Sequence, residues 1–302
     1  MGNLVAITRA NFLPLTVVIV LTGLCAAWYA HGAFNLVNGI LVLIGAVLTH
    51  ASVNAFNNYF DYRSRIDERT MKTPFSGGVD VIVRGQMKPT TAFSVALACL
   101  VGAGLIGIYF LARMFYLLIP MIVYGAFIIV FYTPLLSRVH AISEIIAGSG
   151  FGLIGLGTYA TQAGVIDGSG LAVFVPITIL VALLLFLNEF PDADIDKVAG
   201  RRHTVILIGR RRSSWLYAFF LGATYVSIIL SVIAQAAPVI ALIALVPTPL
   251  AYKAARIALR SYEDVRGLVP ALGLNVIVIL STISLLGLGF LIGVFLRGLF
   301  SL

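Results

Sequence analysis

The sequence predicts an all-α, polytopic integral membrane protein with nine transmembrane helices around a central cavity. Of the 302 residues, 60% are hydrophobic and 11% are charged, whereas soluble domains carry about a quarter charged residues. The mean hydropathy is +1.05, and the apolar residues lie in long runs rather than in the alternating pattern of a membrane barrel. This composition excludes a soluble globular protein, a disordered chain and a disulfide scaffold.

Nine segments are long and apolar enough to form spanning helices, each of which needs about 20 residues. They are roughly residues 12–30, 36–60, 91–112, 115–135, 141–162, 171–190, 214–234, 238–255 and 270–295. The fifth segment carries a group of glycines, which favours close packing of helices in a membrane: Gly148, Gly150, Gly152, Gly155 and Gly157. We therefore expect one membrane-embedded domain over residues 1–302.

The basic residues predict the orientation of these spans. With nine helices, the N-terminus and every second loop share one side, and that side holds 18 of the 20 lysines and arginines. Arg113 and Arg297 lie on the other side. Because basic residues are retained in the cytoplasm, we expect a multi-pass protein of the cytoplasmic membrane with its N-terminus inside the cell.

The acidic residues follow the basic ones, and Asp167 is the exception among the 12. A first cluster closes the second span, where Asn54, Asn57, Asn58 and Asp61 are three or four residues apart. That spacing places them along one side of a helix. Asp67 follows six residues after Asp61, where we expect the helix to give way to a loop.

A second cluster closes the sixth span. Asn188, Asp192 and Asp196 are at positions i, i+4 and i+8, on one face of a continuous helix. We expect Pro191 to kink or locally unwind the helix and Asp194 to point to the opposite side. Both clusters lie at the cytoplasmic ends of their spans.

Two such clusters indicate a site for magnesium and a diphosphate. Four carboxylates brought together would repel one another unless cations joined them. Mg²⁺ takes oxygen ligands and is usually held by one or two carboxylates plus substrate phosphates. The sequence therefore predicts that Asp61, Asp67, Asp192 and Asp196 hold two Mg²⁺ ions and perform the catalysis. The neighbouring amides of Asn57, Asn58 and Asn188 would contact water, metal or phosphate.

Two cytoplasmic loops, at about residues 61–90 and 191–213, would complete and cover this site. The first is long for a polytopic protein, which is typical of a functional loop. Lys72, Arg84 and Lys197 are candidates to bind phosphate oxygens. The alternative is that they are topology signals beside anionic lipid, which we favour for the three arginines of residues 210–212.

These motifs resemble those of the UbiA superfamily of intramembrane aromatic prenyltransferases, and the likeness covers almost the whole chain. The spacing Asn57-x3-Asp61-x5-Asp67 is similar to that of the menaquinone branch, the 1,4-dihydroxy-2-naphthoate prenyltransferases. Three further stretches look like that branch, at residues 74–78 (Pro-Phe-Ser-Gly-Gly), 131–134 (Phe-Tyr-Thr-Pro) and 188–201 (Asn-Glu-Phe-Pro-Asp to Asp-Lys-x-x-Gly-Arg). Arg65 stands where the branch often carries Gly.

The resemblance implies that the donor is an isoprenyl diphosphate, from geranyl to longer chains, with its chain in an apolar tunnel. Departure of the diphosphate leaves an allylic carbocation, which an aromatic acceptor such as 1,4-dihydroxy-2-naphthoate or 4-hydroxybenzoate attacks. It also implies that Arg9 lies near the diphosphate. Tyr132 could face the cation or anchor the chain at the interface. For His140 and Glu144, one turn apart, we favour helix capping over contact with the acceptor.

Other classes stay open on the sequence alone. A cation-coupled transporter would bind its substrate near the membrane midplane, whereas these acids lie at the cytoplasmic helix ends. A phosphatidyltransferase would show an Asp-Gly-x2-Ala-Arg signature, which is absent. Within the superfamily, a non-aromatic acceptor such as a glyceryl phosphate lipid, haem or chlorophyllide stays possible. Apart from these substrates we expect the lipid bilayer as a partner, and no nucleic acid.

Overall fold

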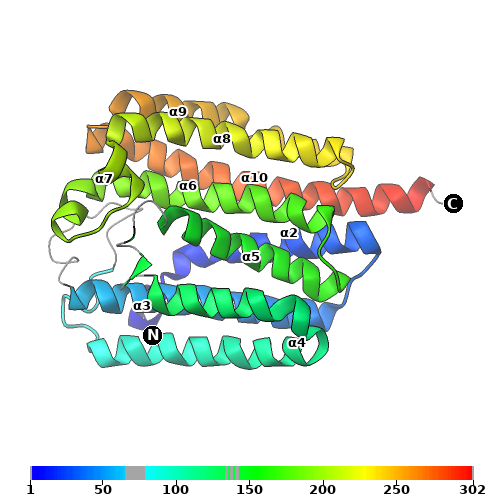
Figure 1. Cartoon of the computed structure of the whole chain (residues 1–302), viewed down its shortest axis with the longest axis horizontal. Coiled ribbons are helices and arrows are strands. Elements are labelled where there is room, and N and C mark those ends of the chain that lie inside the picture. The colour runs from blue at the N-terminus through cyan, green and yellow to red at the C-terminus, as the bar shows by residue number, and fades with distance from the viewer. Residues whose placement is uncertain (1, 65–78, 133–134, 137–138, 140–142, 301–302) are drawn as a thin grey trace.

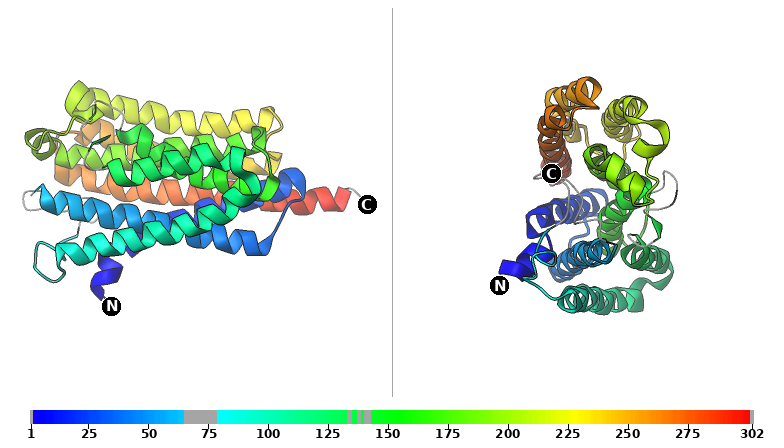
Figure 2. Two further views of the ribbon diagram at one scale, coloured as in Figure 1. Left: turned by 60° about the horizontal axis from the view of Figure 1, so that its bottom comes forward. Right: turned by 90° about the vertical axis from the view of Figure 1, so that its left-hand side faces the viewer.

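The long helices lie along one common axis and form a bundle (Figures 1 and 2). The computed structural model describes residues 2–64, 79–132, 135–136, 139 and 143–300, and this part of the chain contains helices and no strand. The elements in chain order are α1 (Gly2–Ile7), η1 (Ala10–Phe12), α2 (Leu13–His31), α3 (Leu36–Arg63), α4 (Pro89–Phe131), α5 (Ser143–Ala163), α6 (Gly168–Val198), α7 (Thr204–Ile208), α8 (Arg210–Ile233), η3 (Val239–Leu245), α9 (Thr248–Ser261) and α10 (Val265–Phe300).

Seven helical segments in the described part of the chain are long and apolar enough to cross a membrane. That number treats α4 as one segment and leaves out α5. Met114, with φ −140° and ψ 48°, interrupts α4, and the chain doubles back there (Figure 1). The break falls between the third and fourth predicted spans. The number of nine spans stays a prediction, which requires that α4 cross twice and that α5 cross as well.

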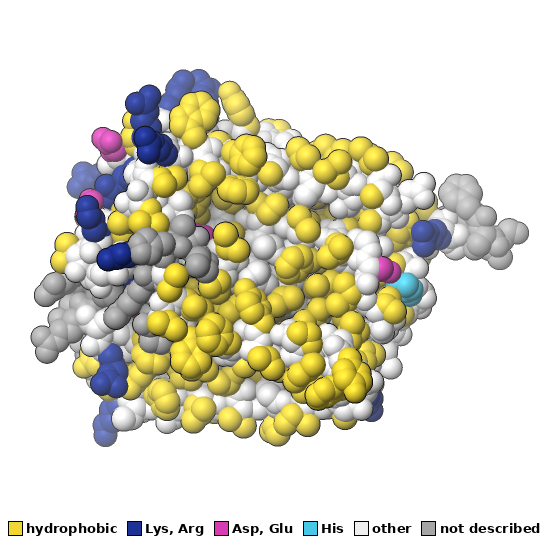
Figure 3. Space-filling model, viewed as in Figure 1, with side chains coloured by type: hydrophobic (Ala, Val, Ile, Leu, Met, Phe, Trp, Pro, Cys, Tyr) yellow, Lys and Arg dark blue, Asp and Glu magenta, His cyan; other side chains and the backbone are white. Residues whose placement is uncertain are grey.

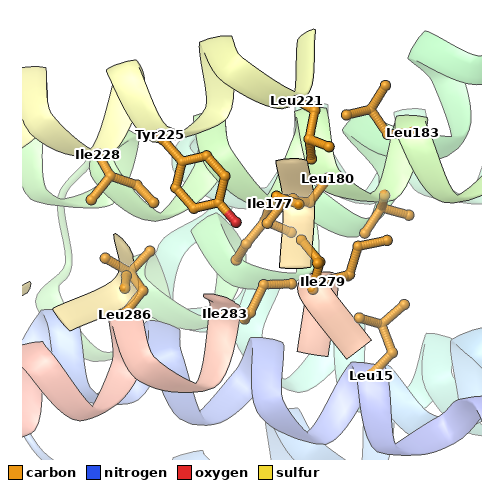
Figure 4. Close-up of a cluster of buried hydrophobic side chains, with 14 of the residues drawn as sticks. Leu15, Ile177, Leu180, Leu183, Leu221, Tyr225, Ile228, Ile279, Ile283 and Leu286 are labelled. Atoms are coloured by element: carbon orange, nitrogen blue, oxygen red, sulfur yellow. The ribbon is translucent and has the colours of Figure 1, made fainter. Parts of the chain in front are cut away.

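Helix α6 forms the centre of the bundle. Of its most apolar 18-residue stretch, 56% is buried, against 17% for α4. Its residues Leu180 and Leu183 belong to a buried cluster that takes side chains from α2, α8 and α10, among them Leu15, Leu221, Tyr225, Ile279 and Ile283 (Figure 4). Burial of this kind along its length holds the C-terminal end of α6, and the second acidic cluster with it, in a fixed place.

The backbone of α6 stays helical through Pro191 to Val198. The expected unwinding at Pro191 is therefore wrong. A proline inside a helix removes one backbone hydrogen bond but leaves the neighbouring turns free to pair, and the packing around α6 keeps the helix continuous. Asn188, Asp192 and Asp196 consequently keep the helical spacing that aligns them on one face.

Basic side chains gather at one end of the molecule, where α7 and the ends of α3 and α6 lie (Figures 1 and 3). Asp167 lies at the opposite end, where it contacts residues of three helices. Its carboxylate accepts hydrogen bonds from the Tyr159 hydroxyl at 2.6 Å and the Ser169 backbone N–H at 2.9 Å. His31 Nε2 lies 2.8 Å from its other oxygen. The one acid predicted on the far side thus caps α6 and ties it to α2 and α5.

Two glycines let α5 approach α6 closely. A Cβ atom added at Gly148 would collide with the backbone carbonyl oxygen of Thr178, and one added at Gly152 would collide with the Thr178 side chain. Small residues at such contacts allow helix backbones in membranes to come together. The packing role that the sequence predicts for these glycines agrees with this arrangement.

We expect Gly148→Ala to lower the melting temperature of the purified protein, because the added methyl group meets backbone that cannot rotate away. Overpacking of this kind costs about 1–3 kcal/mol. The measurement is thermal unfolding in detergent. Gly222→Ala on α8, where an added Cβ atom meets open space, is the matched control. Equal melting temperatures for Gly148→Ala and wild type would contradict the packing role.

Candidate active site

The two acidic clusters meet through one arginine. Arg201 Nη2 donates to Asp61 Oδ1 of α3 at 2.6 Å, and Arg201 Nη1 donates to Asp196 Oδ1 of α6 at 3.1 Å. The side chain of Asp196 is 4% exposed and that of Asp61 is 16% exposed. Burial alone would lower the pKa of Arg201, but the two carboxylates outweigh burial and raise it. The guanidinium therefore stays charged between them.

A glycine turn at the end of α6 places Arg201. Gly200 has a φ of +82°, the left-handed conformation that closes many helices. The Gly200 N–H donates to the Lys197 carbonyl at 3.2 Å, and the Arg201 N–H donates to the Asp196 carbonyl at 2.9 Å. This pair of bonds is a Schellman motif. It folds Arg201 back over Asp196, so the local sequence Asp-Lys-x-x-Gly-Arg builds the bridge.

The rest of the second cluster divides between the two sides of α6. Asp192 lies one turn before Asp196 and is half-buried. Asp194 is 82% exposed and pairs with Arg210 at 3.0 Å, on the opposite side as the sequence predicts. Lys197 is also exposed. Arg84 pairs with Asp80 at 2.9 Å at the surface.

Two asparagines of the first cluster, Asn54 and Asn58, bind the backbone of the N-terminal segment. Asn58 is 1% exposed, and its amide donates to the Asn54 and Ile7 carbonyls and accepts from the Val79 N–H. Asn54 donates to the Thr8 carbonyl at 2.9 Å. These bonds hold the N-terminal segment against α3. Asn58 thus positions the residues near the site through the backbone.

This fastening holds Arg9 in an unusual backbone conformation. Its φ of 49° and ψ of 53° lie in the left-handed region, which costs a residue other than glycine about 1–3 kcal/mol and persists only where the surroundings impose it. Its charge acts on both Asp61 and His50. The strained turn thus carries a cation to a point between these two residues.

A cavity of about 210 Å³ is lined by Asn57, one helical turn before Asp61, and by Asn188, two turns before Asp196, and we call it the central cavity. Four predicted substrate-binding residues line it, namely Arg9, Asn57, Asn188 and Tyr132. Asn54 and His50 add polar groups, and the remaining wall is mostly apolar, with side chains such as Phe12, Leu15 and Phe151. A ligand with a polar head and an apolar body fits such a lining.

Two further cavities adjoin the central one. The chain tunnel, of about 240 Å³, lies among α3, α4 and α5 and shares Thr49, Gly125, Ile129, Gly150 and Ile154 with the central cavity. The side pocket, of about 40 Å³, lies between α2, α6 and α10 and shares Phe12, Leu15 and Leu184 with it. The central cavity therefore adjoins two apolar cavities on different sides.

Buried polar residues support the bridge from the α5 side. Glu144 accepts the Thr204 N–H at 2.8 Å and the Ser143 hydroxyl at 2.9 Å, so it caps α7. His203, 2% exposed, has Nε2 3.3 Å from Asp196 and Nδ1 3.4 Å from Glu189. These contacts hold the loop after α6 against the bundle.

Sequence reasoning gave no individual role to three of these residues: Arg201, Glu189 and His50. The signal for Arg201 was present, because a glycine one residue past a helix end predicts that the next residue folds back onto the helix. No sequence signal separates His50 from a packed core histidine. Asp67, Lys72 and His140 lie outside the described residues.

The donor set fits Mg²⁺. Among the described residues, no three acidic, histidine or cysteine side chains lie close enough to form a metal centre by themselves. Asp61 and Asp196 face one guanidinium, and Asp192 lies one turn from Asp196. Carboxylate oxygens that leave positions for water and substrate phosphates are what Mg²⁺ prefers.

A bundle of long apolar helices, with bridged aspartates near a mostly apolar cavity, is typical of an intramembrane enzyme. Residues 16–277 match the UbiA prenyltransferase family, and the chain belongs to that family. It is a multi-pass membrane protein and a prenyltransferase. This membership decides against the transporter and the phosphatidyltransferase that the sequence left open.

Three relatives show how far the likeness reaches. The 1,4-dihydroxy-2-naphthoate octaprenyltransferase of Bacillus subtilis (strain 168) is 29% identical over 234 residues, which are 76% of this chain and 74% of that protein. A UbiA homologue from Aeropyrum pernix K1 has a TM-score of 0.72 and 17% identity, over 93% of this chain and 98% of that one. A UbiA homologue from Archaeoglobus fulgidus, bound to GPP and Mg²⁺, has a TM-score of 0.61 and 14% identity, over 94% and 99%. At these identities the two structures support the fold alone.

We expect Arg201→Gln to change the affinity for the metal and the affinity for the diphosphate in opposite directions. The variant lacks the guanidinium that neutralises Asp61 and Asp196. Mn²⁺ alone should therefore bind more tightly to the variant than to the wild-type protein. Geranyl diphosphate with Mn²⁺ should bind about tenfold more weakly, or 1.4 kcal/mol, because a phosphate partner is lost. Titration calorimetry in detergent measures both. Arg212→Gln, at an exposed position on α8, is the control, and equal effects in the two variants would refute the bridge.

Proposed function

We propose that this protein transfers a polyprenyl group from an isoprenyl diphosphate to an aromatic acceptor, with its active site facing the cytoplasm. The observation that carries the proposal is the bridged pair Asp61 and Asp196, which lies within two helical turns of the residues Asn57 and Asn188 that line the central cavity. That cavity adjoins the apolar chain tunnel. We further propose a single prenyltransferase domain with nine spans. Its basic end would lie in the cytoplasm, as the positive-inside rule predicts.

The polar mouth would bind the diphosphate. Asp61, Asp67, Asp192 and Asp196 would hold two Mg²⁺ ions, which when bound neutralise charge on the departing diphosphate. Arg201 would turn from the carboxylates toward phosphate oxygens once that charge is present. Arg9 adds a cation at the cavity wall, and Asn57 and Asn188 donate hydrogen bonds from their amides. Lys72, Arg84 and Lys197 stay candidates for contact with the outer phosphate.

The apolar part of the cavity would protect the carbocation. When the bond between C1 of the prenyl group and the diphosphate oxygen breaks, the electron pair leaves with oxygen and C1 becomes cationic. Water would convert this cation to an alcohol, so its exclusion favours transfer. Tyr132 lines the same cavity, and its ring face can stabilise the charge.

The aromatic acceptor is supported by the relative from Bacillus subtilis, whose name specifies 1,4-dihydroxy-2-naphthoate. The motif spacing of the menaquinone branch points the same way. An acceptor panel tests this choice: purified protein is incubated with geranylgeranyl diphosphate, Mg²⁺ and one acceptor at a time. Transfer to a glyceryl phosphate lipid, and to none of the aromatic compounds, would overturn it.

We expect Asp61→Asn and Asp192→Asn to lower the rate of prenyl transfer by about 100-fold or more, because charge stabilisation at the leaving group supplies effects of that size. Chelation of Mg²⁺ with EDTA should abolish transfer, and added Mg²⁺ should restore it. Radiolabelled geranylgeranyl diphosphate and thin-layer separation of the products give the rate.

Asp194→Asn is the matched control, since Asp194 lies on the exposed side of α6 and pairs with Arg210. Its rate should stay within about twofold of wild type, as for most surface substitutions. Full activity in Asp61→Asn, or transfer that persists in EDTA, would rule out the proposed site.

We expect Gly125→Leu to change the preferred chain length of the donor. Gly125 lines both the central cavity and the chain tunnel, and an added side chain there points into open space. A leucine would close the junction, so transfer from geranylgeranyl diphosphate should fall relative to dimethylallyl diphosphate by about tenfold or more. Rates with the two donors measure the ratio. Gly222→Leu on α8 should leave it unchanged, and the same ratio in Gly125→Leu would mean that the chain lies elsewhere.

A further inference from the structure

His50 is a buried, polar residue that the diphosphate chemistry leaves unused. It lies on α3 eleven residues before Asp61, or about 16 Å deeper along a helix with 1.5 Å rise per residue. It lines the central cavity together with Asn54 and Asn57, and it is 6% exposed. Together with Thr49, it is therefore among the deepest polar residues that α3 contributes to this cavity.

Two contacts fix the ring of His50. Its Nδ1 lies 2.7 Å from the Thr16 hydroxyl of α2. Its ring centroid lies 4.8 Å from that of Phe151 on α5, and the two ring planes are at 86° to each other. Thr16 is fully buried. Either atom of this pair can be the donor, and the partner of one ring nitrogen sets the role of the other. In the tautomer with Nδ1–H donating to Thr16, which the role proposed below requires, the Nε2 atom is a proton acceptor.

The two adjoining cavities place His50 on the side away from the prenyl chain. Thr16 follows Leu15, which lines both the central cavity and the side pocket between α2, α6 and α10. The larger chain tunnel leaves on the α4 side. With a polyprenyl chain in that tunnel, the space beside His50, Leu15 and Phe151 stays available for a second substrate, and its walls suit a flat ring.

We propose that this space is the acceptor subsite and that His50 Nε2 is the base that removes the proton from a ring hydroxyl of the aromatic acceptor. The inference rests on the proposed function. Buried bases in hydrogen-bond reach of a reacting group contribute about 10²–10⁴ to a rate. The acceptor class is a hydroxylated aromatic acid.

The step balances without any further reactant. The hydroxyl proton moves to His50 Nε2, and the ring carbon forms a bond to C1 as the C1–O bond breaks and the diphosphate leaves with the electron pair. The attacked carbon then loses CO2, or a proton that the released diphosphate accepts, and the ring becomes aromatic again. His50 returns its proton to the ring oxygen.

Two charged or titratable residues, Arg9 and Tyr132, share the central cavity with His50. The positive charge of Arg9 opposes a second positive charge on His50, so His50 is neutral before the reaction. A guanidinium there stabilises a ring oxygen that has lost its proton. From α2 and α5 the residues in contact with His50 are Thr16 and Phe151, neither of which carries a charge.

His50→Phe and His50→Gln test the inference, the second keeping a polar side chain should the first fail to fold. We expect binding of geranyl diphosphate with Mn²⁺ to stay at the wild-type level, and kcat for transfer to 1,4-dihydroxy-2-naphthoate to fall by about 100-fold. A ring-fluorinated analogue, whose hydroxyl is more acidic and already ionised, should recover most of the lost rate in both variants. A residue that only packs would not respond to the acidity of the acceptor.

His31→Phe is the matched control, because His31 lies at the far end of α2 in contact with Tyr159 and Asp167; its kcat should equal that of wild type. A kcat within threefold of wild type in the His50 variants, or an equal loss with the fluorinated and unfluorinated acceptors, would overturn the inference. A wild-type protein that transfers to no aromatic acceptor would instead refute the proposed function, so the two failures are distinguishable.

Discussion

The guanidinium of Arg201, held between Asp61 and Asp196, is the interaction on which the rest of the site depends. The two aspartates belong to α3 and α6, which are far apart in the sequence, and like charges in a partly buried position repel unless a cation joins them. Arg201 supplies that cation from within the chain. The same requirement explains why the site suits a metal and a diphosphate, since a metal ion can replace the guanidinium beside the carboxylates and a diphosphate can replace the carboxylates beside the guanidinium.

The sequence carries most of the fold and of the polar site. Apolar runs of about 20 residues fix the helices. The four-residue spacing puts Asn57 and Asp61 on one face of their helix, and Asn188 and Asp192 on one face of theirs. The family likeness follows from the same residues. The break in α4 at Met114 also falls where the apolar pattern is interrupted.

Other features depend on tertiary contacts that no spacing rule contains. Asn57 and Asn58 are neighbours in the sequence, yet one faces the cavity and the other holds the N-terminal segment, because one helical step turns a side chain by about 100°. Pro191 predicts a break that packing around α6 prevents. The role proposed for His50 depends on its contact with Thr16 and on its place in the cavity wall. Thr16 and most of the cavity wall belong to other elements of the fold.

The left-handed backbone at Arg9 lowers the stability of the fold, while its side chain supplies a positive charge at the cavity wall. Glycine adopts that conformation without strain, so an unbiased selection for thermostable variants should favour loss of the arginine there. Such a variant would fold better and lack the cation at the cavity wall. Engineering for heat resistance therefore needs to hold this position fixed, in keeping with the trade-off between stability and activity at strained functional sites.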